Sequence, residues 1–229
     1  MSKEKIKEFI IKNDKILKNY SITCSDIIDL KNQFYKEHGK KPRVAEAIIL
    51  RWLHHYLGFP SENYEDEVKQ GDLILRAEKK YPAELGNQTL DISILQGKDI
   101  KVGISIKMST STSAYLDGAD FKNPFFDKYR SHFIKDEMEF EEKRRLRKRI
   151  AVPTLLQDMA RIHNLQKVRE SFSSLTIIYS RRKPKDDFWI NEFKRKYNHQ
   201  YIFLEETPEE AFGDVLTNKL PMVTDLLSK

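Results

Sequence analysis

The sequence predicts an α/β fold in which a central mixed β-sheet is flanked by helices on both faces. Apolar and polar residues alternate over residues 89–108, as in a β-hairpin with one buried face. A nearly continuous apolar run at residues 174–179 is typical of a strand that is covered on both sides. Helical patterns precede and follow these strands, and 229 residues suffice for one sizeable core, so we expect a single domain over residues 1–229.

Two helical patterns open the chain. Apolar residues recur at helical spacing over residues 3–19, with an interruption at Asn13. A second pattern runs from a predicted N-cap at Ser25 to His38. We expect residues 1–40 to form a helical elaboration of the domain.

A third helix is predicted over residues 43–57. Pro42 sets its first turn, Gly58 ends it, and its apolar stripe is wide enough for a central place in the core. Glu46 lies early in this helix, and two interpretations of it are open. Its carboxylate faces solvent near the helix N-terminus, where the helix dipole favours an anion, or it faces the predicted hairpin.

The segment between this helix and the hairpin contains one predicted strand. Residues 61–70 are acidic and polar and predict a loop, whereas residues 72–81 predict a strand. The connection over residues 82–89 holds a proline and a glycine, so we expect irregular backbone there. Glu78 and Glu84 are the carboxylates nearest to this irregular backbone.

The hairpin carries the candidate chemistry. Residues Gln96 to Asp99 supply its turn, and the two strands run on either side. Because residues i and i+2 share a face of a strand, Asp91 on the first strand and Ser105 and Lys107 on the second occupy the polar face. A carboxylate and an ammonium on one face can act together on a metal ion and a phosphate, which predicts a phosphodiester-cleaving site.

This arrangement resembles the motif of the PD-(D/E)XK nuclease superfamily, which includes many restriction endonucleases. In that family the Asp and an acidic residue two positions before the Lys bind a divalent metal, and the Lys orients or activates the attacking water. Asp91 and Lys107 match the motif, whereas Ser105 stands at the acidic position. Some restriction enzymes of the superfamily also carry Ser there and bring the missing carboxylate from a helix, which implies that role for Glu46.

The resemblance also implies a cofactor, a partner and an activity. Mg2+ is the expected ion, with Asp91, Glu46 and Glu84 as candidate ligands, Glu78 as a further one, and Ser105 as a candidate for holding a metal-bound water. We expect a sequence-specific double-stranded DNA endonuclease of the type II restriction enzyme kind. We expect a homodimer, because two-fold symmetry reads a symmetric duplex site. The alternatives are a non-catalytic DNA-binding protein on a degenerate nuclease scaffold, and a repair or structure-specific nuclease.

Hydroxyl-rich and basic segments follow the strand that carries Lys107, and we expect residues 115–170 to form a helical, DNA-contacting insertion. Small hydroxyls and dense positive charge both suit phosphate contacts, although aromatic residues at helical spacing are also typical of a core, and a charged helix also suits solvent. The candidate DNA contacts are Ser109, Thr110, Ser111, Thr112, Ser113, Lys122, Lys128, Arg130, Arg144, Arg145, Arg147, Arg181 and Arg182.

The remaining elements complete the predicted sheet and its cover. A helix begins after Pro153 and continues to about Asn164, and the apolar strand at residues 174–179 follows it. Residues 187–197 predict a helix, residues 200–204 predict a closing strand, and one more helix is expected in the tail.

Composition narrows the class of protein. Lys and Arg number 41 against 35 Asp and Glu, which gives a net charge of +6 and suits an acidic polymer as partner. The single cysteine, Cys24, excludes an internal disulfide and a Cys-based zinc site, so we expect a cytoplasmic protein. No apolar run approaches the ~20 residues that a membrane span requires.

Overall fold

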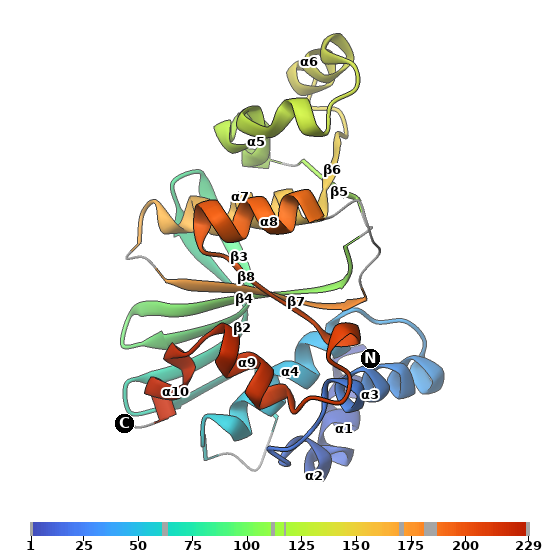
Figure 1. Cartoon of the computed structure of the whole chain (residues 1–229), viewed down its shortest axis with the longest axis vertical. Helices are drawn as coiled ribbons and strands as arrows, with labels where there is room; N and C mark the ends of the chain where they lie inside the picture. The colour runs from blue at the N-terminus through green and yellow to red at the C-terminus, as the bar shows by residue number, and fades with distance from the viewer. Residues whose placement is uncertain are drawn as a thin grey trace.

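A six-stranded mixed sheet lies at the centre of the molecule, between two layers of helices (Figure 1). The computed structural model describes residues 2–60, 64–110, 113–116, 118–169, 172–180 and 187–227. The sheet order is β1-β2-β3-β4-β7-β8; the first four strands are antiparallel, and β7 and β8 continue in parallel from β4. The strands are β1 (Glu67–Gln70), β2 (Leu73–Ala83), β3 (Gly86–Gln96), β4 (Asp99–Ser109), β7 (Ser173–Ser180) and β8 (Gln200–Phe203). This confirms the predicted mixed α/β sheet.

One face of the sheet is covered by the N-terminal helices and the tail (Figure 1). These helices are α1 (Ser2–Lys12), α2 (Asp14–Leu17), α3 (Cys24–His38), α4 (Arg43–Tyr56), α9 (Phe212–Lys219) and α10 (Met222–Leu227). Helix α4 contacts β2, β3 and β4, because its wide apolar stripe packs against Ile92 and Ile104 of the sheet. This packing places the first turn of α4 next to the strands of the hairpin.

The opposite face is covered by α7 (Thr154–Gln166) and α8 (Asp187–Tyr197). Helix α7 is the crossover between the parallel strands β4 and β7, and Leu155 and Leu156 are buried beneath it. Helix α7 falls within residues 115–170, which were predicted to form an insertion, and it belongs to the core.

The rest of that segment forms a further layer outside α7 and α8 (Figure 1). It contains β5 (Ser113–Tyr115), η1 (Gly118–Lys122), α5 (Pro124–Tyr129), η2 (Arg130–His132), α6 (Glu137–Arg145) and β6 (Ala151–Pro153). Strands β5 and β6 pair with each other at its base. The layer is anchored on α8 by aromatic contacts, such as Tyr129 with Trp189 and Phe193.

The connection between β2 and β3 differs from the prediction. The strands run to Ala83 and from Gly86, so the expected irregular backbone is a tight turn in which Gly86 has φ +74°. Pro82 lies within β2, where it is tolerated because β1 pairs only as far as Arg76 and leaves the outer side of β2 without a partner strand among the described residues. Strand β1 itself lies in the segment that was predicted to be a loop.

The N-terminal helices follow the prediction with one correction. Helix α1 ends at Lys12 and α2 begins at Asp14, so the interruption at Asn13 is confirmed. The N-cap of α3 is Thr23 and not Ser25, because the Thr23 side chain and Asp26 form a reciprocal capping box.

Asp14 holds a buried arginine, which gives a stability prediction. The Arg51 side chain is 1% exposed and its Nε donates to Asp14 at 2.6 Å, with His55 Nε2 at 2.8 Å from the same oxygen. Burial alone would raise the pKa of Asp14, but the hydrogen bonds from Arg51, His55 and Lys18 hold that pKa well below its usual range. We expect Asp14→Ala to lower the free energy of unfolding by about 3–5 kcal/mol, since the buried Arg51 loses the half-buried carboxylate with which it pairs.

Urea denaturation of the Asp14→Ala variant at neutral pH measures this loss. Asp29→Ala, on the exposed face of α3, is the control, and we expect it to change stability by less than about 0.5 kcal/mol. Because the folded-state pKa of Asp14 is depressed, its contribution is present above pH 4 and shrinks as the pH falls further. The free energies of unfolding of the wild type and of Asp14→Ala should therefore converge in acid. An equal difference between them at every pH would contradict the ion-pair explanation.

Candidate active site

Strands β3 and β4 part at the position of Asp91. Their pairing extends to Ile92 opposite Ile104 and is not continued at Asp91. The Asp91 carboxylate instead accepts a hydrogen bond from the backbone N–H of Ile106 at 2.6 Å. The carboxylate thus takes the place of a strand partner at this position, which fixes it between the two strands.

Strand β2 is distorted at the same level. Ala77 pairs with Ile92 and Lys79 pairs with Leu90, whereas Glu78 between them has φ +48° and no pairing partner on β3. A positive φ is unusual for a residue with a side chain, and such strain is concentrated at functional sites. The irregular backbone therefore centres on Asp91 from both neighbouring strands.

Lys107 lies beside Asp91, as the hairpin geometry predicts. Its Nζ is 4.0 Å from the Asp91 carboxylate and 2.8 Å from the carboxylate of Asp158 on α7. The Asp158 side chain is 7% exposed. The structure thus brings together the two residues that the sequence singled out and adds a third, buried carboxylate.

Asp158 was missed, although the sequence holds a signal for it. It lies at helical spacing from Leu155 and Ile162, both of which are buried in the core under α7. An acidic residue within an apolar stripe needs a buried partner. That partner cannot be named from the sequence, because it depends on how α7 docks on the sheet.

Burial and the neighbouring charges shift the pKa values of Lys107 and Asp91. Burial lowers the pKa of Lys107, but Asp158 and Asp91 outweigh it and hold that pKa above its usual value, so Lys107 is a permanent ammonium at neutral pH. Burial chiefly raises the pKa of Asp91, and Asp158 adds to the effect, while Lys107 opposes it.

Glu46 approaches Asp91 from the α4 side of the sheet. It is half-buried and lines a pocket of about 170 Å³ together with Arg43, Tyr64 and Glu78. Burial, and then the neighbouring Asp91 and Glu78, raise the pKa of Glu46 to about 7. Of the two interpretations of Glu46, the structure therefore supports the one in which its carboxylate faces the hairpin.

The other predicted carboxylates have different positions. Glu84 lies in the turn at the end of the β2–β3 arm, where its Oε2 accepts from Lys167 Nζ at 2.7 Å. The structure does not bring it to Asp91, because the hairpin is regular and carries Glu84 away from the distorted residues. Glu78 does lie at the level of Asp91, and it forms an ion pair with Arg43 at 2.9 Å.

A buried polar network lies behind Asp158. Ser105 is buried and is the register partner of Thr176 on β7. Thr176 Oγ1 lies 3.5 Å from the Asp158 carboxylate and 2.8 Å from Nε2 of His199. Burial lowers the pKa of His199 to about 4, so its neutral ring fixes Thr176 without adding charge beside the ion pair.

The donor set suits Mg2+ in composition. In the described ranges no group of three or more His, Cys, Asp or Glu side chains has the spacing of a metal site. Asp91 and Glu46 are nevertheless electrostatic neighbours whose pKa values are both raised. Mg2+ binds proteins through one or two carboxylates together with water and substrate phosphates, and a divalent cation would relieve the repulsion between these two.

Three basic side chains among the predicted DNA contacts form bonds within the protein. Lys128 donates to the Tyr197 hydroxyl at 2.8 Å, and Arg130 forms ion pairs with Glu137 and Glu141. Arg144 donates to the Phe121 carbonyl at 2.8 Å and pairs with Asp127. These three side chains contribute to the contacts within the outer layer, so part of the positive charge there is matched by nearby acceptors.

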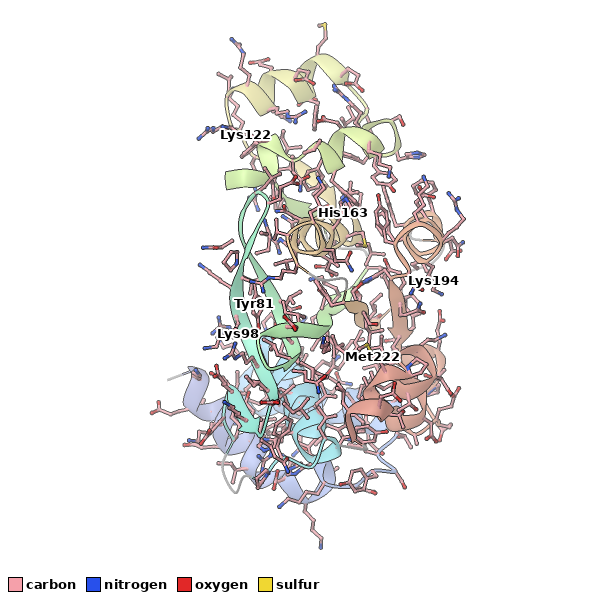
Figure 2. The ribbon with its side chains drawn as sticks, turned by 90° about the vertical axis from the view of Figure 1, so that its left-hand side faces the viewer. Tyr81, Lys98, Lys122, His163, Lys194 and Met222 are labelled. Carbon is pink, nitrogen blue, oxygen red and sulfur yellow. The ribbon has the colours of Figure 1, made fainter. Side chains whose placement is uncertain are left out.

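The other predicted contacts fall into three groups. Lys122, Arg145 and Arg147 are exposed on the outer layer, and Figure 2 shows Lys122 beyond α7, which carries His163. Ser109 ends β4, Thr110 is buried and Ser113 is exposed on β5. Ser111, Thr112, Arg181 and Arg182 lie outside the described residues.

No family model, curated protein or solved structure matches this chain. Within the part of the chain that the structure describes, the helices are too short or too polar to cross a membrane. The case for a function therefore depends on the geometry around Asp91.

Proposed function

We propose that the protein is a Mg2+-dependent DNA endonuclease with its active site at Asp91, Glu46 and Lys107. The observation that carries the proposal is the 4.0 Å approach of Lys107 to Asp91 where β3 and β4 part. Phosphodiester hydrolysis requires carboxylates that hold a metal and a cation near the attacking water. Bound Mg2+ would polarise the phosphate and lower the pKa of the water.

Different residues of the chain would bind the metal and orient the attacking water. Asp91 and Glu46 would hold the metal, one from each side of the sheet. Lys107 would orient the attacking water and balance charge on the phosphate, and it would not act as a general base, because Asp158 and Asp91 keep it protonated. Ser105 stands at the position where the resembled family carries an acidic metal ligand. Glu46 would supply that ligand instead.

The order of elements supports the same assignment. Helix α4 precedes the antiparallel strands β2, β3 and β4, and α7 then leads to the parallel strand β7. This is the order expected for the core of the nucleases that the motif resembles. Topology alone does not establish an activity, so it supports the proposal only together with the residues at Asp91.

The proposed substrate is double-stranded DNA read at a specific sequence, by a homodimer. The net charge of +6 favours a polyanionic partner. A homodimer would match a symmetric duplex site, with one active site for each strand.

Incubation of plasmid and phage DNA with the protein and Mg2+ tests the proposal. Discrete fragments that disappear with EDTA are the expected result. A smear would indicate a nuclease without sequence preference, such as a repair enzyme. An absence of cutting at every protein concentration, with DNA binding retained, would overturn the endonuclease in favour of a binding protein on a degenerate scaffold.

A further inference from the structure

A basic pocket of about 480 Å³ opens near the turn between β3 and β4. It lies on the α7 side of the sheet, because Ile74 and Leu95 at its base belong to the same core as that helix. The charged residues that line it are Lys69, Asp72, Arg76, Lys98 and Arg169. Four cations and one carboxylate around a hollow make a surface that favours an anion.

The cations of this pocket are only partly neutralised by the protein. Arg76 pairs with Glu67 at 3.2 Å. Among the described residues, no carboxylate pairs with Lys69, Lys98 or Arg169. The positive charges of Lys69, Lys98 and Arg169 are therefore available to a negatively charged ligand.

Arg169 is prepared for such a ligand. Its guanidinium lies over the ring of Tyr81, 5.2 Å from the centroid. Its buried Nε has no hydrogen-bond partner within the residues that the structure describes. A guanidinium that is fixed on an aromatic face and has an N–H without a partner suits the oxygens of a phosphate.

The pocket is adjacent to the candidate active site. The Tyr81 hydroxyl and Ser93 Oγ are 2.6 Å apart, and Ser93 follows Asp91 by two residues on β3. Arg76 is the register partner of Ser93 on β2. Two residues of a strand span about 7 Å, and one strand of duplex DNA advances ~3.4 Å per nucleotide. The pocket is therefore within a few nucleotides of a backbone that is held at Asp91.

We propose that this pocket is a phosphate subsite that holds the backbone of the nucleic acid substrate beside the bond to be cleaved. The identity of the polymer rests on the proposed function, whereas the phosphate chemistry rests on the pocket itself. In Figure 2, Tyr81 and Lys98 lie on the same strand-rich side of the molecule, where the pocket opens.

The test measures binding of a labelled DNA duplex in EDTA, so that cleavage plays no part. We expect Lys98→Ala combined with Arg169→Ala to bind about tenfold more weakly at low salt, and to reduce the slope of log affinity against log salt by about two. The matched control removes the same charge from α2 and α3, by Lys15→Ala combined with Lys36→Ala, two exposed lysines on the opposite layer. We expect the control to bind like the wild type.

Lys98→Glu provides a second variant, because Lys98 is exposed in a turn and its replacement leaves the core intact. It should weaken duplex binding more than Lys98→Ala does. Unchanged duplex binding in the pocket variants, or an equal loss in the control, would overturn the subsite. The same holds if a deoxynucleoside monophosphate binds the wild type saturably and is lost in the pocket variants while duplex affinity stays constant.

The outcomes separate the subsite from the endonuclease. A wild-type protein that does not cut, but loses duplex binding in the pocket variants, would remove the proposed activity and keep the subsite. A wild-type protein that cuts, with pocket variants that bind normally, would remove the subsite alone.

Discussion

Replacement of Lys107 by alanine is expected to lower the rate of DNA cleavage by about 10³-fold or more and to leave duplex binding largely intact. The ammonium of Lys107 lies 4.0 Å from the Asp91 carboxylate, and an alanine side chain offers no charge to balance that of the phosphate. Single-turnover cleavage of a plasmid substrate, with binding measured in EDTA, separates the two effects. Lys101→Ala is the matched control, because it removes a lysine from the same strand and face, where Lys101 is 3.9 Å from Asp99.

The proposed metal ligands of the same site give similar predictions. Asp91→Ala should also abolish cleavage, since it removes the carboxylate that lies between β3 and β4. Glu46→Gln should raise the Mg2+ concentration that is needed for half-maximal cutting. If Glu46→Gln cuts normally, Asp158 becomes the better candidate for the helical carboxylate. A Lys107→Ala or Asp91→Ala variant that cuts at the wild-type rate would show that the site is misplaced.

Asp158→Ala is expected to lower the cleavage rate by about 10²-fold through its effect on Lys107. Its carboxylate is 2.8 Å from the Lys107 Nζ and is itself held by Thr176, so it fixes the direction of the ammonium. Asp158 is thus a positioning residue in this proposal.

A double-mutant cycle on the cleavage rate checks this role, because the effects of residues that act as a unit are not additive. We expect Asp158→Ala to cause no further loss in the Lys107→Ala background. Asn164→Ala is the control on the same helix, where Asn164 is buried and bonds to the β2–β3 turn. Equal losses from Asp158→Ala in both backgrounds would indicate a general effect on folding and contradict positioning.

Local patterns predicted the site only where a single element determines the geometry. The alternation over residues 89–108 placed Asp91 and Lys107 on one face, because that relation depends only on strand periodicity and the turn. Asp158 comes from a helix that is distant in sequence, and its approach to Lys107 depends on the packing of α7 against the sheet. Glu46 stayed open between two interpretations for the same reason.

Charge density was a poorer guide than periodicity. Arg130 and Arg144 lie in two separate basic segments that suit DNA, yet both pair with carboxylates of the outer layer. Sequence shows the charges but not which of them meet. Strand β1 was missed because Glu67–Gln70 is short and polar, and it forms only by pairing with residues 73–76 of β2.

The outer half of β2 also bears on self-association. Beyond Ala77 this edge has no neighbouring strand among the described residues, and exposed edges invite pairing with a second molecule. Pro82 interrupts any such ladder, and Lys79 and Lys80 would place like charges against their own copies across the two-fold axis. The proposed homodimer should therefore not form a continuous intermolecular sheet through this part of β2.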